Sequence, residues 1–203
     1  MKPLIFDATP LIYLGKIDLI EKIRHLPEDK YTTKSVCIEV VEVGKNIGRK
    51  EAFVIEKLIN SKIIKLKSPT NKQYTSALRQ NPKIHEADTD VLALAIELNG
   101  IALLDDEEAR GMAETEGIEH HGTIYLLLRM MKMKLLTKEE VFESLNEMIR
   151  MGWRCSTELY AEMIMTLSPW VQRVENTPSE REGMNLTLCN CNTYPKKGIV
   201  QRP

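Results

Sequence analysis

The sequence predicts an α/β fold in which helices cover a central parallel sheet. Short apolar runs alternate along the chain with longer segments of helical periodicity. Two of these runs, Leu4-Ile5-Phe6 and Ile101-Ala102-Leu103-Leu104, are followed directly by aspartate and then by a helix-like segment. This pattern is typical of buried parallel strands that deliver their last residue to a helix start. Strands separated by helices favour a parallel, helix-covered sheet.

In the first half of the chain, caps and breakers set the expected elements. Ser35 is a candidate N-cap, and Gly44 is a candidate stop for the helix between them. Residues 63–66 alternate weakly between apolar and polar side chains, which predicts a strand. Strands are expected over residues 4–7, 31–33 and 63–66. Helices are expected over residues 10–16, 19–24, 35–43, 49–60 and 71–80.

The second half of the chain carries clearer boundary signals. Asn99-Gly100 predicts the end of one helix, and Gly117 predicts the end of the next. Thr137 and Glu140 have the spacing of a capping box. One strand is expected over residues 101–104. Helices are expected over residues 88–98, 107–116, 123–133, 137–151 and 156–167, with 123–133 and 137–151 as an αα pair.

The chain of 203 residues is long enough to bury one substantial core. Residues 1–168 are expected to form one domain that includes appended C-terminal helices. Helical periodicity is lost beyond Pro169, and the polar composition that follows predicts a poorly ordered tail over residues 169–203. No secretory pattern opens the chain and charges interrupt every apolar run, so we expect a cytoplasmic protein without a membrane span.

The net charge of −1 conceals a strong asymmetry along the chain. Residues 1–85 carry a balance of +7, and residues 86–123 carry a balance of −10. An acidic segment beside a basic one fits a metal centre flanked by surface that attracts a polyanion. For most of the individual lysines, an ordinary solvated helix face is the better interpretation.

Carboxylates gather where the predicted strands and helices meet. Asp7 and Asp105-Asp106 follow the two apolar runs, so they should face one crevice at the carboxyl end of the sheet. Between them lie Glu39 and the segment His85-Glu86-Ala87-Asp88-Thr89-Asp90. Carboxylates around one pocket repel each other unless a hard cation lies among them. The residues therefore predict a Mg²⁺ or Mn²⁺ site suited to phosphodiester chemistry.

Four short motifs resemble those of PIN-domain ribonucleases, the family that includes the VapC-type toxins. Asp7-Ala8-Thr9 resembles the first motif, and Ile38-Glu39-Val40-Val41 resembles the second. Asp90-Val91-Leu92-Ala93 resembles the third, and Leu104-Asp105-Asp106 resembles the fourth. The four occur in the family's order over about residues 3–125, and the helices after Gly122 resemble a longer prokaryotic subgroup.

The resemblance implies a PIN-like three-layer fold and a metal-dependent endoribonuclease, either alone or as the toxin of a toxin–antitoxin pair. It implies catalytic roles for Asp7, Glu39, Asp90 and Asp106, and it adds Asp88 and Asp105 as further metal ligands. The implied cofactor is Mg²⁺ or Mn²⁺, and the implied partners are RNA and an antitoxin protein.

Several alternatives remain open at the level of sequence. Leu104 stands where the family usually has Thr or Ser, which leaves room for a catalytically degenerate module that binds a partner or RNA. Asp88 and Asp90 cannot share one helix face, and Asp88 is also a candidate N-cap. Either Asp105 or Asp106 could cap the helix from residue 107. A phosphatase or nucleotide hydrolase is disfavoured because no glycine-rich phosphate loop is present.

The C-terminal helices suggest a contact surface. Met130, Met131 and Met133 lie near the turn of the αα pair, and methionine-rich faces adapt to varied partners. Packing of these methionines within the protein's own core is an equally good interpretation. We expect a homodimer or an antitoxin-bound complex that uses residues 123–151. His120 and His121 are adjacent, which favours structural roles over zinc binding.

Overall fold

The central sheet of the computed structural model, which describes residues 1–71, 75–76, 78 and 85–167, is parallel throughout. Its strand order in the described part of the chain is β3-β2-β1-β4-β5. The strands are β1 (Leu4–Phe6), β2 (Lys30–Thr32), β3 (Lys65–Leu66), β4 (Ile101–Leu103) and β5 (His120–His121). Phe6 at the end of β1 pairs with Thr32 on one side and Leu103 on the other, so the ends of these strands are in register. The predicted α/β class is confirmed.

Helices connect the strands along the chain. They are α1 (Ala8–Lys16), the 3₁₀-helix η1 (Ile20–His25), α2 (Lys34–Cys37), the π-helix η2 (Ile38–Val43), α3 (Gly44–Asn46), α4 (Glu51–Asn60), α6 (Glu86–Leu98), α7 (Glu107–Thr115), α8 (Thr123–Lys132), α9 (Lys138–Arg150) and α10 (Thr157–Leu167). The predicted end of α6 is confirmed, because Asn99 adopts the left-handed conformation there.

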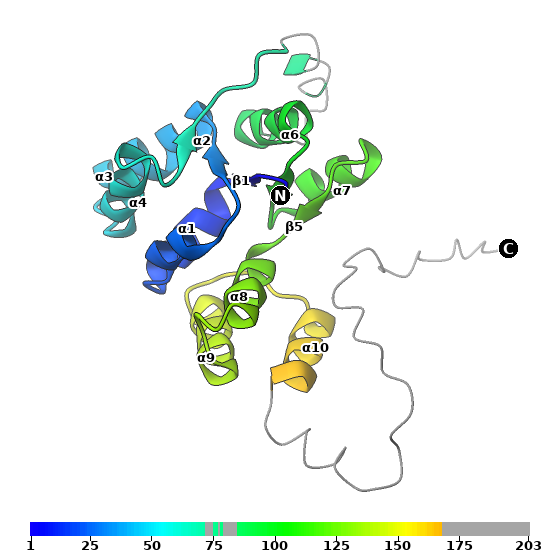
Figure 1. The fold of residues 1–203 in the computed structure, drawn as a ribbon. Coiled ribbons are helices and arrows are strands. Elements are labelled where there is room, and N and C mark those ends of the chain that lie inside the picture. Colours follow the sequence, from blue (N-terminus) through cyan, green and yellow to red (C-terminus); the bar gives the residue numbers. More distant parts are fainter. Residues whose placement is uncertain (72–74, 77, 79–84, 168–203) are drawn as a thin grey trace, which may run out of the picture. The chain divides into compact units, whose positions relative to one another are not determined.

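Helices lie on both faces of the sheet, and Figure 1 shows α1 and α6 on opposite sides of β1. On one side, α1 packs against α4, η1, η2 and α8. On the other, α6 packs against β1 and β4. The arrangement follows from right-handed crossovers, because the chain moves outward from β1 to β2 and β3 and then returns to β4 on the far side of β1.

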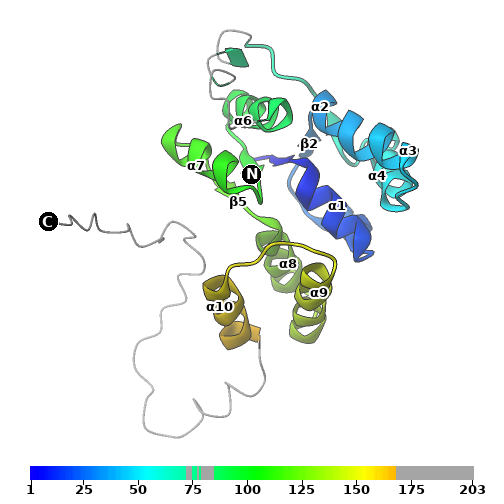
Figure 2. The same ribbon diagram turned by 180° about the vertical axis from the view of Figure 1, so that it is seen from behind.

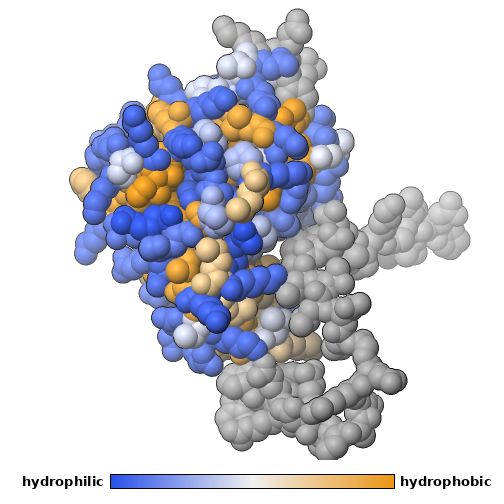
Figure 3. All heavy atoms as spheres, in the orientation of Figure 1, coloured by the Kyte–Doolittle hydropathy of each residue, from blue (hydrophilic) through white to orange (hydrophobic). Residues whose placement is uncertain are grey.

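The strands β1 and β4 form the centre of the hydrophobic core. Leu4, Ile5 and Phe6 are fully buried, as are Ala102 and Leu103. A strand that is covered on both faces needs a continuous apolar run. This explains why β1 and β4 were the strands most clearly predicted from the sequence. The surface seen in Figure 3 is mostly hydrophilic, with apolar areas interrupted by polar side chains.

The C-terminal helices α8, α9 and α10 lie together, as Figure 2 shows from behind. The predicted capping box is present: Thr137 N donates to Glu140 Oε2 at 2.7 Å, and Glu140 N donates to Thr137 Oγ1 at 3.1 Å. Helix α10 packs against α9, where Tyr160 Oη donates to Asn146 Oδ1 at 2.9 Å. Helix α8 contacts α1, so the C-terminal helices extend the same core.

The structure differs from the sequence-based expectations at two elements. The helix expected from Ser35 begins instead after Thr33, whose side chain accepts from Val36 N, and it becomes a π-helix at Ile38. The short strand β5 was not expected, because its two histidines carry no apolar pattern. It forms because Leu104 N donates to His121 O at 2.8 Å, an interaction between distant residues.

Two further expectations lie largely or wholly outside the described residues. These are the helix over residues 71–80, most of which falls on residues 72–74, 77 and 79–80, and the tail over residues 169–203. Within the described part, no helix is long and apolar enough to cross a bilayer.

Candidate functional site

The candidate site lies at the topological switch point of the sheet. From β1 the strand order runs outward to β2 and β3 in one direction and to β4 and β5 in the other. The helices that follow β1 and β4 therefore diverge, which leaves a crevice outside the carboxyl ends of these two strands. Asp7 follows β1 directly, and Asp106 is the N-cap of α7 just after β4.

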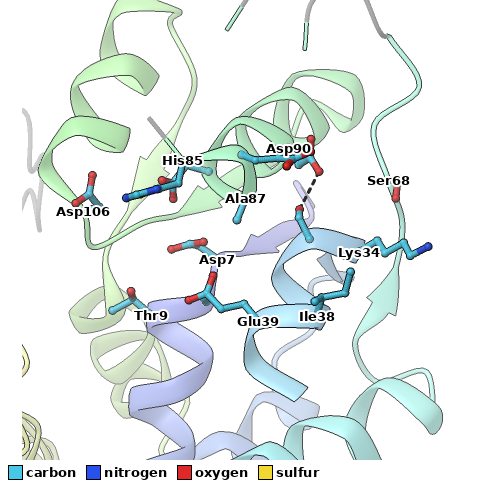
Figure 4. Close-up of a pocket in the computed structure, with 14 residues that line it drawn as sticks. Asp7, Thr9, Lys34, Ile38, Glu39, Ser68, His85, Ala87, Asp90 and Asp106 are labelled. Atoms are coloured by element: carbon cyan, nitrogen blue, oxygen red, sulfur yellow. Dashed lines mark hydrogen bonds between the residues drawn. The ribbon is translucent and has the colours of Figure 1, made fainter. Parts of the chain in front are cut away.

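This crevice is an open pocket of about 740 Å³. Six acidic side chains line it, from the ends of β1 and β4, from η2 and from the start of α6: Asp7, Glu39, Glu86, Asp88, Asp90 and Asp106. The close-up in Figure 4 shows the Glu39 carboxylate directed toward Asp7, with Asp106 on the far side of the pocket. Residues almost a hundred positions apart in the sequence are thus brought to one cavity.

Asp7 is the most perturbed of these acids. It is 4% exposed, and its burial together with the negative charge of Asp88 raises its pKa from the ordinary 3.8 to about 8. Glu39 acts in the same direction, while the backbone N–H groups of Ala8 and Thr9 act against it. A buried carboxyl group among other acids holds a proton at neutral pH unless a cation replaces that proton.

Glu39 lies on the π-helix η2, where the wider turn changes the direction of side chains relative to an α-helix. Its neighbour Ile38 also lines the pocket, whereas Val40 and Val41 are buried in the core. The apolar pair anchors η2, and Glu39 extends from it toward the acids of the pocket. Single-turn π-helical segments occur frequently at functional sites.

The structure separates the roles of Asp88 and Asp90. Asp88 is 6% exposed, and burial together with the charge of Asp106 raises its pKa to about 6. Asp90 instead accepts a hydrogen bond from Ser35 Oγ at 2.8 Å, as the dashed line in Figure 4 shows. Both side chains line the pocket, and Asp88 interacts electrostatically with Asp7 and Asp106.

The N-cap interpretation of Asp88 is wrong. Helix α6 begins at Glu86 with His85 as its N-cap, so Asp88 lies in the first helical turn. His85 lines the pocket beside it and lowers the pKa of Asp88, opposing the effect of burial. The first turn of a helix favours negative charge, which places Asp88 where a carboxylate is tolerated.

The structure also separates Asp105 from Asp106. Asp106 lines the pocket and caps α7, because Ala109 N donates to its Oδ1 at 3.0 Å. Asp105 is used elsewhere: Thr123 donates to it from N at 2.7 Å and from Oγ1 at 2.5 Å, and Trp153 Nε1 donates at 3.0 Å. Both oxygens of Asp105 are therefore committed to holding α8 and the segment after α9.

Sequence reasoning missed four polar residues that line the pocket, namely Lys34, Ser35, Ser68 and His85. Lys34 begins α2 and adds a positive charge to the acidic cavity. Its position just after β2, at the same edge of the sheet as Asp7, was a signal that could have revealed it. Ser68 likewise lies two residues after β3, although the strand pattern there is weaker.

The fit of the acidic residues to a divalent cation rests on the chemistry of the donors. Among the described residues, no three acidic, histidine or cysteine side chains stand close enough together to hold a metal ion as they are. However, carboxylate oxygens are the ligands that Mg²⁺ and Mn²⁺ favour. The raised pKa values of Asp7 and Asp88 show that their negative charges lack compensation. The donor set fits such an ion, and the side chains would have to move together to bind it.

A doubly wound parallel sheet with an acidic pocket at its switch point defines an α/β protein with a candidate ligand site at the carboxyl ends of its strands. Comparison with protein families identifies it further, because the PIN domain family matches residues 3–169. The chain belongs to the PIN domain family. A search of proteins of curated function gave no significant match. The PIN domain is a nuclease-type fold, and its members generally use divalent metal ions.

We predict that Asp7→Asn stabilises the metal-free protein, and more strongly at higher pH. Between about pH 4 and pH 8 the folded protein retains a proton on Asp7 that the unfolded chain releases, so its stability falls as the pH rises through this window. Asparagine removes this effect. The difference in melting temperature between variant and wild type, measured in EDTA, should therefore grow from about pH 5 to about pH 8.

Asp18→Asn is the matched control, because Asp18 is exposed and its left-handed backbone suits asparagine equally well. Its melting-temperature difference should not follow that of Asp7→Asn. A lower melting temperature for Asp7→Asn at every pH would show instead that the carboxylate is a structural hydrogen-bond acceptor.

Loss of the Asp105 carboxylate should destabilise the protein. Asp105→Ala leaves three donors of Thr123 and Trp153 without their acceptor, so we expect the free energy of unfolding to fall by about 3 kcal/mol. Trp153→Phe removes one of these bonds and should cost about 1 kcal/mol. Urea denaturation measures both, with the exposed Glu108→Ala as a control expected within about 0.5 kcal/mol of wild type. An Asp105→Ala variant as stable as this control would contradict the assignment.

Proposed function

We propose that this PIN-domain protein is a divalent-metal-dependent ribonuclease that hydrolyses RNA phosphodiester bonds. The observation that carries the proposal is the pair of buried carboxyl groups, Asp7 and Asp88, whose pKa values rise to about 8 and about 6. Strongly perturbed carboxyl groups in a pocket at a sheet switch point are typical of functional sites. Such buried carboxyl groups lower the stability of the folded protein when they ionise, unless a bound cation neutralises their charge.

Asp7, Glu39, Asp88 and Asp106 would hold Mg²⁺ or Mn²⁺, because these are the acids that interact with one another across the pocket. When bound, the ion lowers the pKa of a coordinated water and neutralises charge on the phosphodiester. Asp90 is a positioning residue in this proposal, since its hydrogen bond with Ser35 ties the start of α6 to α2. Asp105 is left out of the ligand set, because both its oxygens are occupied.

The remaining polar residues of the pocket act on the substrate in this proposal. Lys34 supplies a positive charge that attracts a phosphate into a cavity otherwise lined by acids. The hydroxyl of Thr9 at the start of α1 can donate a hydrogen bond to a phosphate oxygen. No side-chain nucleophile is required for this hydrolysis.

A degenerate PIN module that binds RNA or a partner without cleavage is the second candidate. Leu104, in the position where the family usually has Thr or Ser, is fully buried and offers no hydroxyl to the pocket. Cleavage assays separate the two candidates directly.

We also propose that the protein works as a toxin with an antitoxin, or as a homodimer. Met130 is fully buried in the core, whereas Met131 and Met133 remain half-buried on the α8 side. Of the three methionines, only Met131 and Met133 are therefore accessible for an interface. Light scattering after size-exclusion chromatography should show more than one protomer, and Met131→Glu should dissociate it without lowering the melting temperature. A monomer at about tens of micromolar would exclude the homodimer.

The nuclease proposal predicts that RNA is cleaved with Mg²⁺ or Mn²⁺ and that EDTA abolishes cleavage. Asp7→Asn and Asp88→Asn should each lower kcat/KM more than about 100-fold, because each loses a direct metal ligand. Asp90→Asn should lower it only about 10-fold, as is typical of residues that orient ligands. Asp88 and Asp90 provide a matched pair, since the same substitution is made two residues apart on one helix.

Gel analysis of varied single-stranded and structured RNAs measures this cleavage. No cleavage with any divalent ion would favour the degenerate module, and cleavage in excess chelator would contradict the metal-dependent mechanism. If Asp90→Asn lowers kcat/KM more than Asp88→Asn does, Asp90 rather than Asp88 is the metal ligand at the start of α6.

A further inference from the structure

A group of cationic and aromatic side chains adjoins the pocket on one face of α1. Thr9 lines the pocket, Tyr13 follows one helical turn later, and Lys16 follows about one turn after that. Residues at these spacings share a helix face, and the rise of the helix places Tyr13 about 6 Å and Lys16 about 10 Å beyond Thr9. Lys16 Nζ lies 4.7 Å from the centroid of the Tyr13 ring.

Two arginines flank this face from distant parts of the chain. A Cβ built on Gly152 would lie 3.9 Å from the Tyr13 hydroxyl oxygen, so the segment leading to Arg154 passes beside that hydroxyl. A Cβ built on Gly15 would lie 2.6 Å from Glu51 Cβ, so the segment that contains Arg49 lies against α1 on its other side. Both arginines are exposed.

The electrostatics agree with this geometry. Burial and the charge of Asp105 raise the pKa of the Tyr13 phenol, whereas Arg49 and Arg154 lower it, so all three charges act on one hydroxyl group. Asp105 keeps its negative charge, but its carboxylate is held by hydrogen bonds from Thr123 and Trp153. Among the described residues, neither arginine forms an ion pair.

We propose that Tyr13, Lys16, Arg49 and Arg154 form a phosphate-binding subsite for an RNA strand whose scissile phosphodiester lies in the acidic pocket. Guanidinium groups bind phosphate oxygens through paired N–H donors, and the Tyr13 hydroxyl supplies a further donor. An acidic pocket repels the polyanion that it must accept. A neighbouring cationic surface offsets this repulsion and holds the strand in register.

This inference rests on the proposed ribonuclease function, because that function places the strand in the pocket. Continuity with the pocket through Thr9 favours RNA over an acidic protein as the ligand. The subsite lies about one nucleotide from the pocket, so it should bind strands of several nucleotides and should contribute nothing to a minimal dinucleotide.

Binding of a labelled single-stranded RNA of about 12 nucleotides, measured by fluorescence anisotropy in EDTA at several salt concentrations, tests the subsite without cleavage. The double variant Arg49→Ala/Arg154→Ala should weaken binding by about tenfold or more at low salt. It should also reduce the slope of log affinity against log salt by about 1.4, since each phosphate contact on a single strand contributes about 0.7. Tyr13→Phe should weaken binding less and leave the slope unchanged.

Lys50→Ala/Arg150→Ala is the charge-matched control, because both residues are exposed and each lies close in sequence to one of the arginines. It should retain the affinity and the salt slope of the wild type more closely than the test variant. Equal losses in the two double variants would overturn the subsite and indicate non-specific attraction. Unchanged RNA binding in Arg49→Ala/Arg154→Ala, with lost binding of poly-glutamate, would assign the surface to an acidic protein and overturn the proposal.

The outcome is separable from that of the nuclease proposal. If RNA is bound through the two arginines but never cleaved, the subsite stands and the ribonuclease function fails. If RNA is cleaved with metal and the double variant raises KM equally for a dinucleotide and for the longer strand, the function stands and the subsite is overturned. The expected result is a raised KM for the longer strand alone, with kcat retained.

Discussion

Burial of two carboxyl groups, Asp7 and Asp88, beside other acids is the constraint on which the site depends. Asp7 lies at the end of the central strand β1, where burial prevents water from stabilising its charge and Asp88 and Glu39 add negative potential. Folding alone would favour an apolar or hydrogen-bonding side chain in this position. The unfavourable arrangement is understandable in functional terms, because a divalent cation can replace the proton on Asp7 and bring the acids together.

The fold produces this arrangement through its topology. With β1 at the centre of the sheet and β4 beside it on the return path, the helices that follow them diverge and the acids at the strand ends face one crevice. Asp105 then joins the C-terminal helices to the same place, because it accepts hydrogen bonds from Thr123 at the start of α8 and from Trp153 after α9. These helices therefore support the strand end that presents Asp106.

Much of this architecture could be predicted from the sequence, because buried parallel strands leave a strong local pattern. The apolar runs that became β1 and β4 indicated Asp7 and the pair Asp105-Asp106, and the cap signals gave the C-terminal end of α6 and the start of α9. Which of Asp88 and Asp90 is the better candidate for a metal ligand could not be predicted from the sequence. It depends on the start of α6 at Glu86 and on a hydrogen bond from Ser35, 55 residues away. The role of Asp105 depends likewise on Trp153, 48 residues away.

The most direct test of the central claim is the number of protons released when the metal-free protein binds Mn²⁺. Isothermal titration in buffers of different ionisation enthalpy measures it. Since Asp7 holds a proton at neutral pH, with a pKa of about 8, binding near pH 7 should release about one proton per site. The release should fall toward zero near pH 9, where Asp7 is already ionised, and it should disappear in Asp7→Asn. Binding at pH 7 without proton release, or with the same release in Asp7→Asn, would contradict the claim that the ion replaces the proton on Asp7.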